Sequence, residues 1–160
     1  MQKIEVGIQA KIGALFFIFW GILHVWVGIE GVQTYLEGLV SQWNLLIGGS
    51  KVPLASFQYT TNPATAFAHA HLILNFCIDV AGYGVLGLVV AYLIWIRGSW
   101  SAYWIGTIII GIADLTFLFA MVTSGVIVQN VGTVGGPILW FFAVVITPFG
   151  LSRSEGYCLN

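Results

Sequence analysis

Four long apolar runs constrain this chain more than any other feature of its sequence. They extend from Ile12 to Ile29, from Ala64 to Ile96, from Ser101 to Val128 and from Val134 to Leu151. A helix needs about 20 apolar residues to cross the roughly 30 Å hydrocarbon core of a bilayer. Of the 160 residues only 7% are charged, whereas soluble domains have roughly 25%. The sequence therefore predicts an integral membrane protein.

The four runs predict an all-α fold, a single membrane domain over residues 1–160 built as a bundle of four transmembrane helices. We expect these helices at about residues 11–30, 64–96, 101–128 and 134–151. The one long connection, between the first and second helices, contains the amphipathic segment TYLEGLVSQWNLLIGG. Such a segment suits the membrane interface or a position over the end of the bundle. Long ordered connections often serve as lids.

Positively charged side chains predict the orientation of the bundle. Lys51 alone falls outside if the N-terminus is cytoplasmic, and the other four fall inside. These four are Lys3, Lys11, Arg97 and Arg153. Because cytoplasmic loops are enriched in lysine and arginine, we expect an N-in, C-in, multi-pass protein of the cytoplasmic (inner) membrane with an extracytoplasmic long loop. The net charge of −1 gives no reason to expect a nucleic-acid partner.

Ionisable side chains within or beside the spans are the candidate functional groups, because such groups are costly in a membrane. They are His24, Glu30, His69, His71, Asp79 and Asp114. The segment NPATAFAHAHLILNFCID contains the densest set. Within it, His71, Asn75 and Asp79 recur every four residues and share one stripe of a helix. His69 points about 160° away from His71, so the two histidines face different surfaces.

Three chemistries suit these groups, and the residues alone leave all three open. One or two histidines could ligate a haem. A metal ion could bind among His24, Asp79 and Asp114, whose expected depths agree within about 7 Å. The acidic groups could also relay protons. A haem with a histidine from each of the first two helices is disfavoured, because His24 lies about 15–20 Å below His69 and His71.

The segment AFAHAHLILN resembles the second helix of the styrene oxide isomerases, a family of small four-helix membrane enzymes. In that family a helix-2 motif has Ala, any residue, Ala and His, with Asn six positions after the His. Here the motif is Ala66, Phe67, Ala68, His69 and Asn75. The similarity continues in IGTIIIGIAD and GGPILWFFAVVITPFG and covers most of the chain. It implies a homotrimer with ferric haem b at each subunit interface, His69 as the axial ligand of the iron, and Asn75 as a polar contact to the substrate.

The resemblance also implies an activity, the redox-neutral conversion of an aryl epoxide to an aldehyde by a 1,2-hydride shift, with ferric haem as a Lewis acid. Two departures from the family pattern concern the substrate and the ligand. The third helix has Phe117 and Phe119 in LTFLFAMV where the family has a tyrosine, and His71 has no counterpart. Helical periodicity alone favours His71 as the ligand, because it shares a stripe with Asn75. A pocket shared by two protomers could use His69 from one and Asn75 from the next, and we therefore expect His69 to be the ligand.

Two other functions fit the same sequence. The tetrapeptide HAHL also resembles one found in small relatives of haem–copper oxidase subunit I. A haem-binding electron-transfer subunit of a membrane respiratory complex would place protein ligands on both sides of the iron. A haem-free membrane protein that binds a lipid or small molecule would instead use acids such as Glu30 and Asp79. An absorption spectrum of the purified protein distinguishes these functions.

Overall fold

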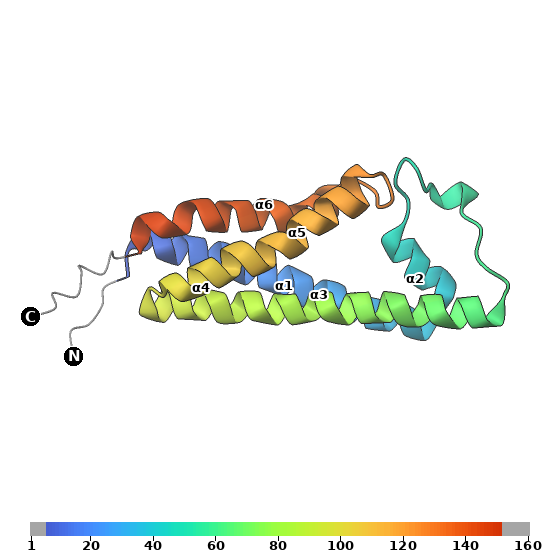
Figure 1. The fold of residues 1–160 in the computed structure, drawn as a ribbon, viewed down its shortest axis with the longest axis horizontal. Helices are drawn as coiled ribbons and strands as arrows, with labels where there is room; N and C mark the ends of the chain where they lie inside the picture. The colour runs from blue at the N-terminus through green and yellow to red at the C-terminus, as the bar shows by residue number, and fades with distance from the viewer. Residues whose placement is uncertain (1–5, 152–160) are drawn as a thin grey trace, which may run out of the picture.

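The computed structural model describes residues 6–151 as a bundle of long helices (Figure 1). In chain order its elements are α1 (Ile8–Glu37), α2 (Leu39–Leu46), the 3₁₀ turn η1 (Leu54–Ser56), α3 (Pro63–Arg97), α4 (Trp100–Ile105), the π-helical η2 (Gly106–Ile110), α5 (Gly111–Phe117), the π-helical η3 (Leu118–Thr123), α6 (Val131–Ile146) and the 3₁₀ turn η4 (Thr147–Gly150). Within the described residues there is no strand, only an isolated bridge between Gly48 and Ile127.

Four helical runs are long and apolar enough to cross a membrane. They are α1, α3, the continuous run Trp100–Thr123 and the run Val131–Gly150. For the described residues, the prediction of an all-α chain with four potential membrane spans is therefore confirmed. Lys3 and Arg153, which contribute to the expected orientation, lie outside the described residues.

Local chemistry explains where two of the spans begin. α3 starts at Pro63, where the Asn62 side chain accepts a hydrogen bond from the backbone of the first turn at 3.0 Å. Asparagine is a favourable N-cap, and proline suits the first helical position. α6 starts at Val131 rather than near residue 134, because Asn130 and the third residue of the helix form a reciprocal capping box.

The first helix continues well beyond its expected end at residue 30. Gly31 marked the expected start of the loop, yet it stays helical and packs directly against Cys77 of α3. Glycine allows this close approach of two helices. The chain leaves the helix only at Gly38, whose φ of 113° favours glycine. His24 therefore lies near the middle of α1 rather than toward its outer end.

The third span is shorter than expected, since it ends at Thr123 instead of near residue 128. The hydroxyl groups of Thr123 and Ser124 each donate to the backbone carbonyl four residues earlier. Side-chain bonds of this kind compete with regular helix, and Gly125, with φ of 84°, then turns the chain. The apolar residues that follow belong to a loop, which hydrophobicity alone does not distinguish from helix.

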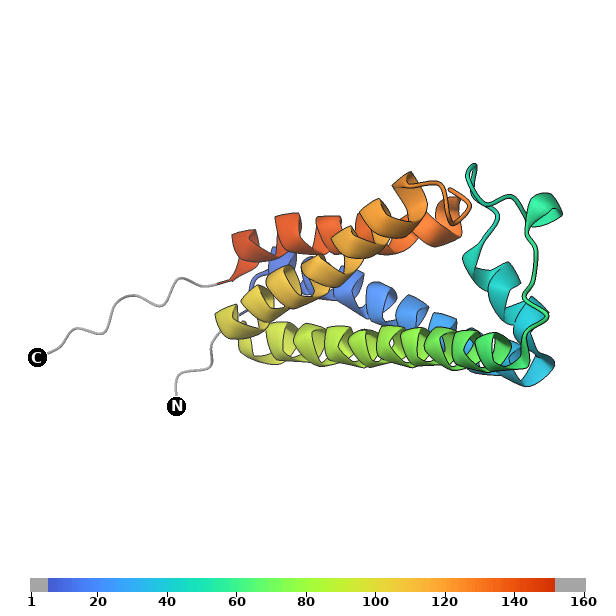
Figure 2. The ribbon, with the colours of Figure 1, turned by 45° about the vertical axis from the view of Figure 1, so that its right-hand side comes forward.

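The helices form two pairs that are packed together at one end and diverge toward α2 (Figures 1 and 2). At the packed end the N–H of Gly7 donates to the carbonyl of Gly150 at 3.0 Å. Further along, Gly136 of α6 lies against the His24 ring of α1. The adjacent Gly135 faces open space. α6 and α1 are therefore still in contact at His24, and nearer α2 the pairs diverge (Figures 1 and 2).

Helices α1 and α3 make the most intimate contact in the bundle. A Cβ atom built on Gly84 would lie 2.7 Å from both the carbonyl oxygen of Gly21 and the amide nitrogen of Val25. These are backbone atoms of the neighbouring helix, so no side-chain rotation could make room. Small residues at such crossings allow the van der Waals contact that holds membrane helices together.

The long connection fills part of the space between the diverging pairs. Leu46 of α2 packs with Ile73 and Cys77 of α3 and with Ile127, which follows η3. Backbone hydrogen bonds fix the connection to the same loop, from Gly49 N–H to the Val126 carbonyl and from Lys51 N–H to the Gly125 carbonyl, both at 2.9 Å. α2 is thereby held across the open end of the bundle (Figure 1).

Candidate functional site

One side of α3 presents three polar side chains that its own chain leaves exposed. His71, Asn75 and Asp79, one helical turn apart, form this polar stripe. The amide nitrogen of Asn75 donates to a carboxylate oxygen of Asp79 at 2.9 Å. Gly82 continues the stripe by one more turn, and a Cβ atom there would meet nothing within 4 Å. The stripe is thus a polar surface on a helix that is otherwise apolar enough to span a membrane.

The imidazole of His71 has a defined orientation within the stripe. Its Nδ1 lies 2.9 Å from the carbonyl oxygen of Phe67, and because a carbonyl only accepts, Nδ1 carries the hydrogen. Nε2 is then available as an acceptor or metal ligand. The Tyr35 hydroxyl of α1 lies 3.4 Å from it, which is long for a hydrogen bond. The exposed ring therefore directs a weakly engaged nitrogen away from α3.

His69 lies on a different surface of the same helix, as the spacing predicts. Its ring is half-buried and meets Trp43 of α2 edge to face, with ring centroids 5.5 Å apart. Trp43 also packs against Phe57, and Phe57 against Tyr59, with centroid separations of 5.1 Å. His69 therefore belongs to an aromatic cluster whose other members, Trp43, Phe57 and Tyr59, lie in the long connection between α1 and α3.

A second cluster of polar groups lies inside the bundle and consists of Trp20, His24 and Asp114. The indole nitrogen of Trp20 donates to one carboxylate oxygen of Asp114 at 2.7 Å. The Nε2 atom of His24 lies 3.5 Å from the other carboxylate oxygen. The His24 ring stacks on Trp20 with centroids 3.7 Å apart. Asp114 is 2% exposed, so this cluster places a carboxyl group in the interior of the helical bundle.

Asp79 is not part of the interior cluster, so the single chain does not bring together His24, Asp79 and Asp114, the metal-binding group that the sequence left open as one of three chemistries. Asp79 is exposed and bonded to Asn75, whereas His24 and Asp114 face each other. Among residues 6–151, no three histidine, cysteine, aspartate or glutamate side chains come together in a metal-binding group. Similar expected depths on three helices did not bring these residues together, because depth does not determine which faces of the helices meet.

The helix that carries Asp114 is irregular on both sides of it. α5 lies between two π-helical turns, η2 and η3. Such turns break the regular hydrogen-bond ladder and often occur at functional sites. At the first of them the indole nitrogen of Trp140 donates to the carbonyl of Gly106 at 3.1 Å. Both the widened turns and the role of Trp20 escaped sequence analysis, although the Trp20–His24 spacing of four residues placed these rings on one face.

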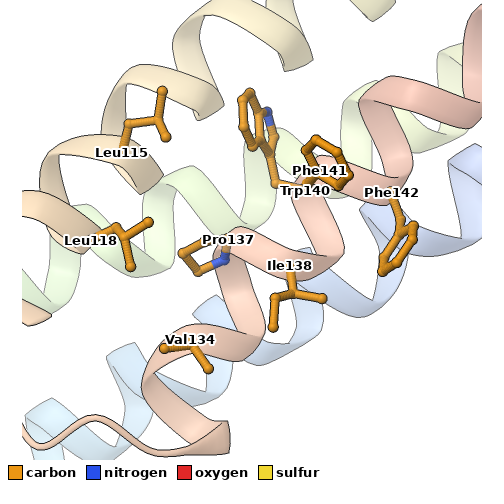
Figure 3. A pocket seen from close by; sticks show the side chains of 8 residues that line it. All are labelled: Leu115, Leu118, Val134, Pro137, Ile138, Trp140, Phe141 and Phe142. Carbon is orange, nitrogen blue, oxygen red and sulfur yellow. The ribbon is translucent and has the colours of Figure 1, made fainter. Parts of the chain in front are cut away.

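A third feature is an apolar groove of about 500 Å³ between α5 and α6 (Figure 3). Leu115 and Leu118 line one side, and side chains of α6 from Val134 to Phe142 line the other. None of the residues in either polar cluster contributes to this lining.

No family model, curated protein or solved structure matches this chain. The candidate site is therefore defined by its own residues. It comprises the polar stripe of α3, with His69 on the adjacent face, and the interior cluster of Trp20, His24 and Asp114.

Proposed function

We propose that this chain is a membrane-bound, haem b-dependent isomerase that converts an aryl epoxide to an aldehyde, similar to the styrene oxide isomerases. The exposed polar stripe of His71, Asn75 and Asp79 carries the proposal. Polar and ionisable side chains of spanning helices rarely face lipid. The stripe therefore faces protein or water rather than lipid. A second copy of the chain, with a haem between the copies, would cover it and would account for the homotrimer that the sequence resemblance implies.

Two histidines are candidates for the axial ligand, and their surroundings differ. The resemblance favours His69, which is half-buried against Trp43. The contacts favour His71, which is exposed and donates Nδ1–H to the Phe67 carbonyl. Histidine ligands commonly donate their second ring nitrogen in this way, and the hydrogen bond fixes the orientation of the ring. A haem ligand on the polar stripe would also place Asn75 on the same side of α3 as the iron.

Ferric haem, when bound near the α3 histidines, would supply a Lewis acid that draws charge from the epoxide oxygen. The chain supplies the orientation of the substrate. Asn75 donates one amide hydrogen to Asp79, which leaves its other amide hydrogen free to donate to a substrate oxygen. Asp79 thus holds the amide plane in place. The hydride moves between neighbouring carbons of the substrate, so the reaction requires no external oxidant or reductant.

The membrane setting suits such a substrate. An aryl epoxide is apolar and hydrolyses in water, so a site that is reached from the bilayer excludes the competing reaction. We also propose that the protein lies in the cytoplasmic membrane with both ends inside. Lys11 and Arg97 lie at the packed end of the bundle and Lys51 lies at the end with α2, which agrees with the usual distribution of positive charge.

The absorption spectrum and the turnover of the purified protein test the proposed function. We expect a Soret band typical of ferric haem with one protein ligand, and formation of an aldehyde from styrene oxide without nicotinamide, flavin or oxygen. A protein without pigment contradicts the proposal and favours the haem-free binding protein. Iron with protein ligands on both sides, together with absence of turnover, favours the electron-transfer subunit.

Replacement of Gly82 by tryptophan tests whether a second copy covers the polar stripe. A side chain at this position meets open space in one chain, so Gly82→Trp should preserve the fold but prevent close approach of another subunit. We expect light scattering to change from the mass of three chains to that of one, with loss of most of the haem. Ile22→Trp, at an exposed position of α1, serves as the control and should keep the wild-type mass. An unchanged mass in Gly82→Trp would contradict an interface at the stripe.

A further inference from the structure

The interior cluster differs from the polar stripe because the chain itself buries it. Asp114 and Trp20 are buried, and His24 retains 17% side-chain exposure. The three side chains connect α1 to the third span near the middle of both helices. The proposed isomerase uses none of these groups, so the cluster requires an explanation of its own.

The hydrogen bonds of the cluster leave one position for a proton. His24 Nδ1 lies 2.8 Å from the carbonyl oxygen of Trp20, which only accepts, so Nδ1 carries a hydrogen. One oxygen of Asp114 already accepts from the Trp20 indole. The remaining atoms that face each other are His24 Nε2 and the second oxygen of Asp114. If neither atom carried a proton, the lone pair of His24 Nε2 would face a negatively charged oxygen of Asp114.

The net charge of the cluster depends on how many protons the His24–Asp114 pair holds. With one proton, either imidazolium faces carboxylate or neutral imidazole faces a protonated acid, and both arrangements have no net charge. Loss of the proton leaves one negative charge inside the bundle, and a second proton leaves one positive charge. An uncompensated charge within a membrane span is strongly unfavourable. The cluster is therefore most stable when it holds a single proton.

The geometry allows this proton to exchange. The Nε2–oxygen distance of 3.5 Å exceeds the roughly 2.7–2.9 Å of a strong charge-assisted hydrogen bond. His24, with 17% side-chain exposure, is the less buried partner of the pair. Within residues 6–151, the neighbours packed here are uncharged: α3 packs Gly84 and Leu88 against this part of α1, and α6 packs Gly136 against both His24 and Asp114.

The cluster also occupies a position where helix packing changes. His24 touches α6 at Gly136, and toward α2 the two helix pairs diverge (Figure 2). Repulsion between a deprotonated imidazole nitrogen and a carboxylate at this point would act directly to separate the third span from α1.

We propose that Trp20, His24 and Asp114 form a proton-binding site inside the bundle, and that its single exchangeable proton, held between His24 Nε2 and Asp114, keeps the third and fourth spans packed against α1. The site binds a proton independently of any haem. Its loss or gain of a proton changes the packing of the helices, whereas the failure of haem binding would leave it intact.

The thermal stability of three proteins across a range of pH tests this proposal. The melting temperature of the wild type should be highest over an intermediate range of pH. It should fall by on the order of 10 °C at more acidic and at more alkaline pH. Asp114→Asn can accept from Trp20 and donate to His24 with no proton to lose, so its alkaline fall should disappear while its acid fall remains. His24→Gln removes the imidazole that would carry the second proton, so its acid fall should disappear.

An alkaline fall of equal size in Asp114→Asn and the wild type, or no pH dependence in the wild type, overturns the proposal. If Asp114→Asn does not fold, nitrogen NMR of the wild-type histidines provides the test, with His24 identified by the signals that His24→Gln lacks. The Nε2 signal of His24 should change in the alkaline range while Nδ1 keeps its hydrogen. A constant Nε2 signal across the fall in melting temperature also overturns the proposal.

Discussion

His71→Ala is expected to remove most of the Soret absorbance of the purified protein, whereas His69→Ala retains most of it. The physical reason is the orientation of the two rings. His71 is exposed and its Nδ1–H is fixed by the Phe67 carbonyl, and its Nε2 has only a long contact of 3.4 Å with the Tyr35 hydroxyl, which a haem iron could replace. His69 is packed edge to face against Trp43. The measurement is the ratio of haem to protein absorbance in each variant.

External imidazole provides the control for loss of the ligand. If His71→Ala loses haem because it lacks the ligand, imidazole added during reconstitution should restore binding in that variant. The opposite pattern, with haem lost from His69→Ala and kept by His71→Ala, would assign the ligand as the family resemblance does. Haem retained in full by both variants would contradict any role of α3 histidines as the ligand.

Gly84→Ala is expected to destabilise the bundle by about 1–3 kcal/mol or more, the range for overpacking a tightly packed core. The added methyl group would lie 2.7 Å from the Gly21 carbonyl oxygen and from the Val25 amide nitrogen. Both atoms belong to the backbone of α1, so relief requires the two helices to separate. Unfolding of the protein in mixed detergents, followed by circular dichroism, measures the change.

Gly135→Ala is the matched control, because a methyl group there meets nothing within 4 Å. Alanine is favoured over glycine in a helix by up to about 1 kcal/mol, so this variant should be neutral or slightly more stable. If Gly84→Ala and Gly135→Ala are equally stable, the backbones of α1 and α3 are not in close contact at Gly84.

Hydropathy was sufficient to predict the helical class and the four potential spans, because each apolar run is long enough to cross a bilayer. Helical periodicity also separated the surfaces of His69 and His71, since that separation depends only on their spacing along one helix. It placed Asn75 and Asp79 on one stripe, where they form a hydrogen bond. These features are local to one segment of chain.

Contacts between helices were harder to predict. His24 and Asp114 were candidates, but their pairing requires knowledge of which faces of α1 and the third span meet. Trp20 was overlooked because tryptophan in an apolar helix usually packs, although its indole nitrogen can donate to a buried acid. Gly31 resembled the start of a loop, yet its role is to allow contact with Cys77. Sequence alone does not distinguish a glycine that ends a helix from one that admits a neighbour.

The spans differ greatly in length, and this has a consequence for the lipids around the protein. At 1.5 Å per residue, the 35 residues of α3 extend about 52 Å, whereas the 20 residues of Val131–Gly150 extend about 30 Å. A bilayer that matches the shorter span leaves much of α3 beyond the hydrocarbon unless that helix tilts. Acyl-chain length thus becomes a variable in reconstitution, because hydrophobic mismatch on one side of the bundle is relieved only by tilt or by local deformation of the bilayer.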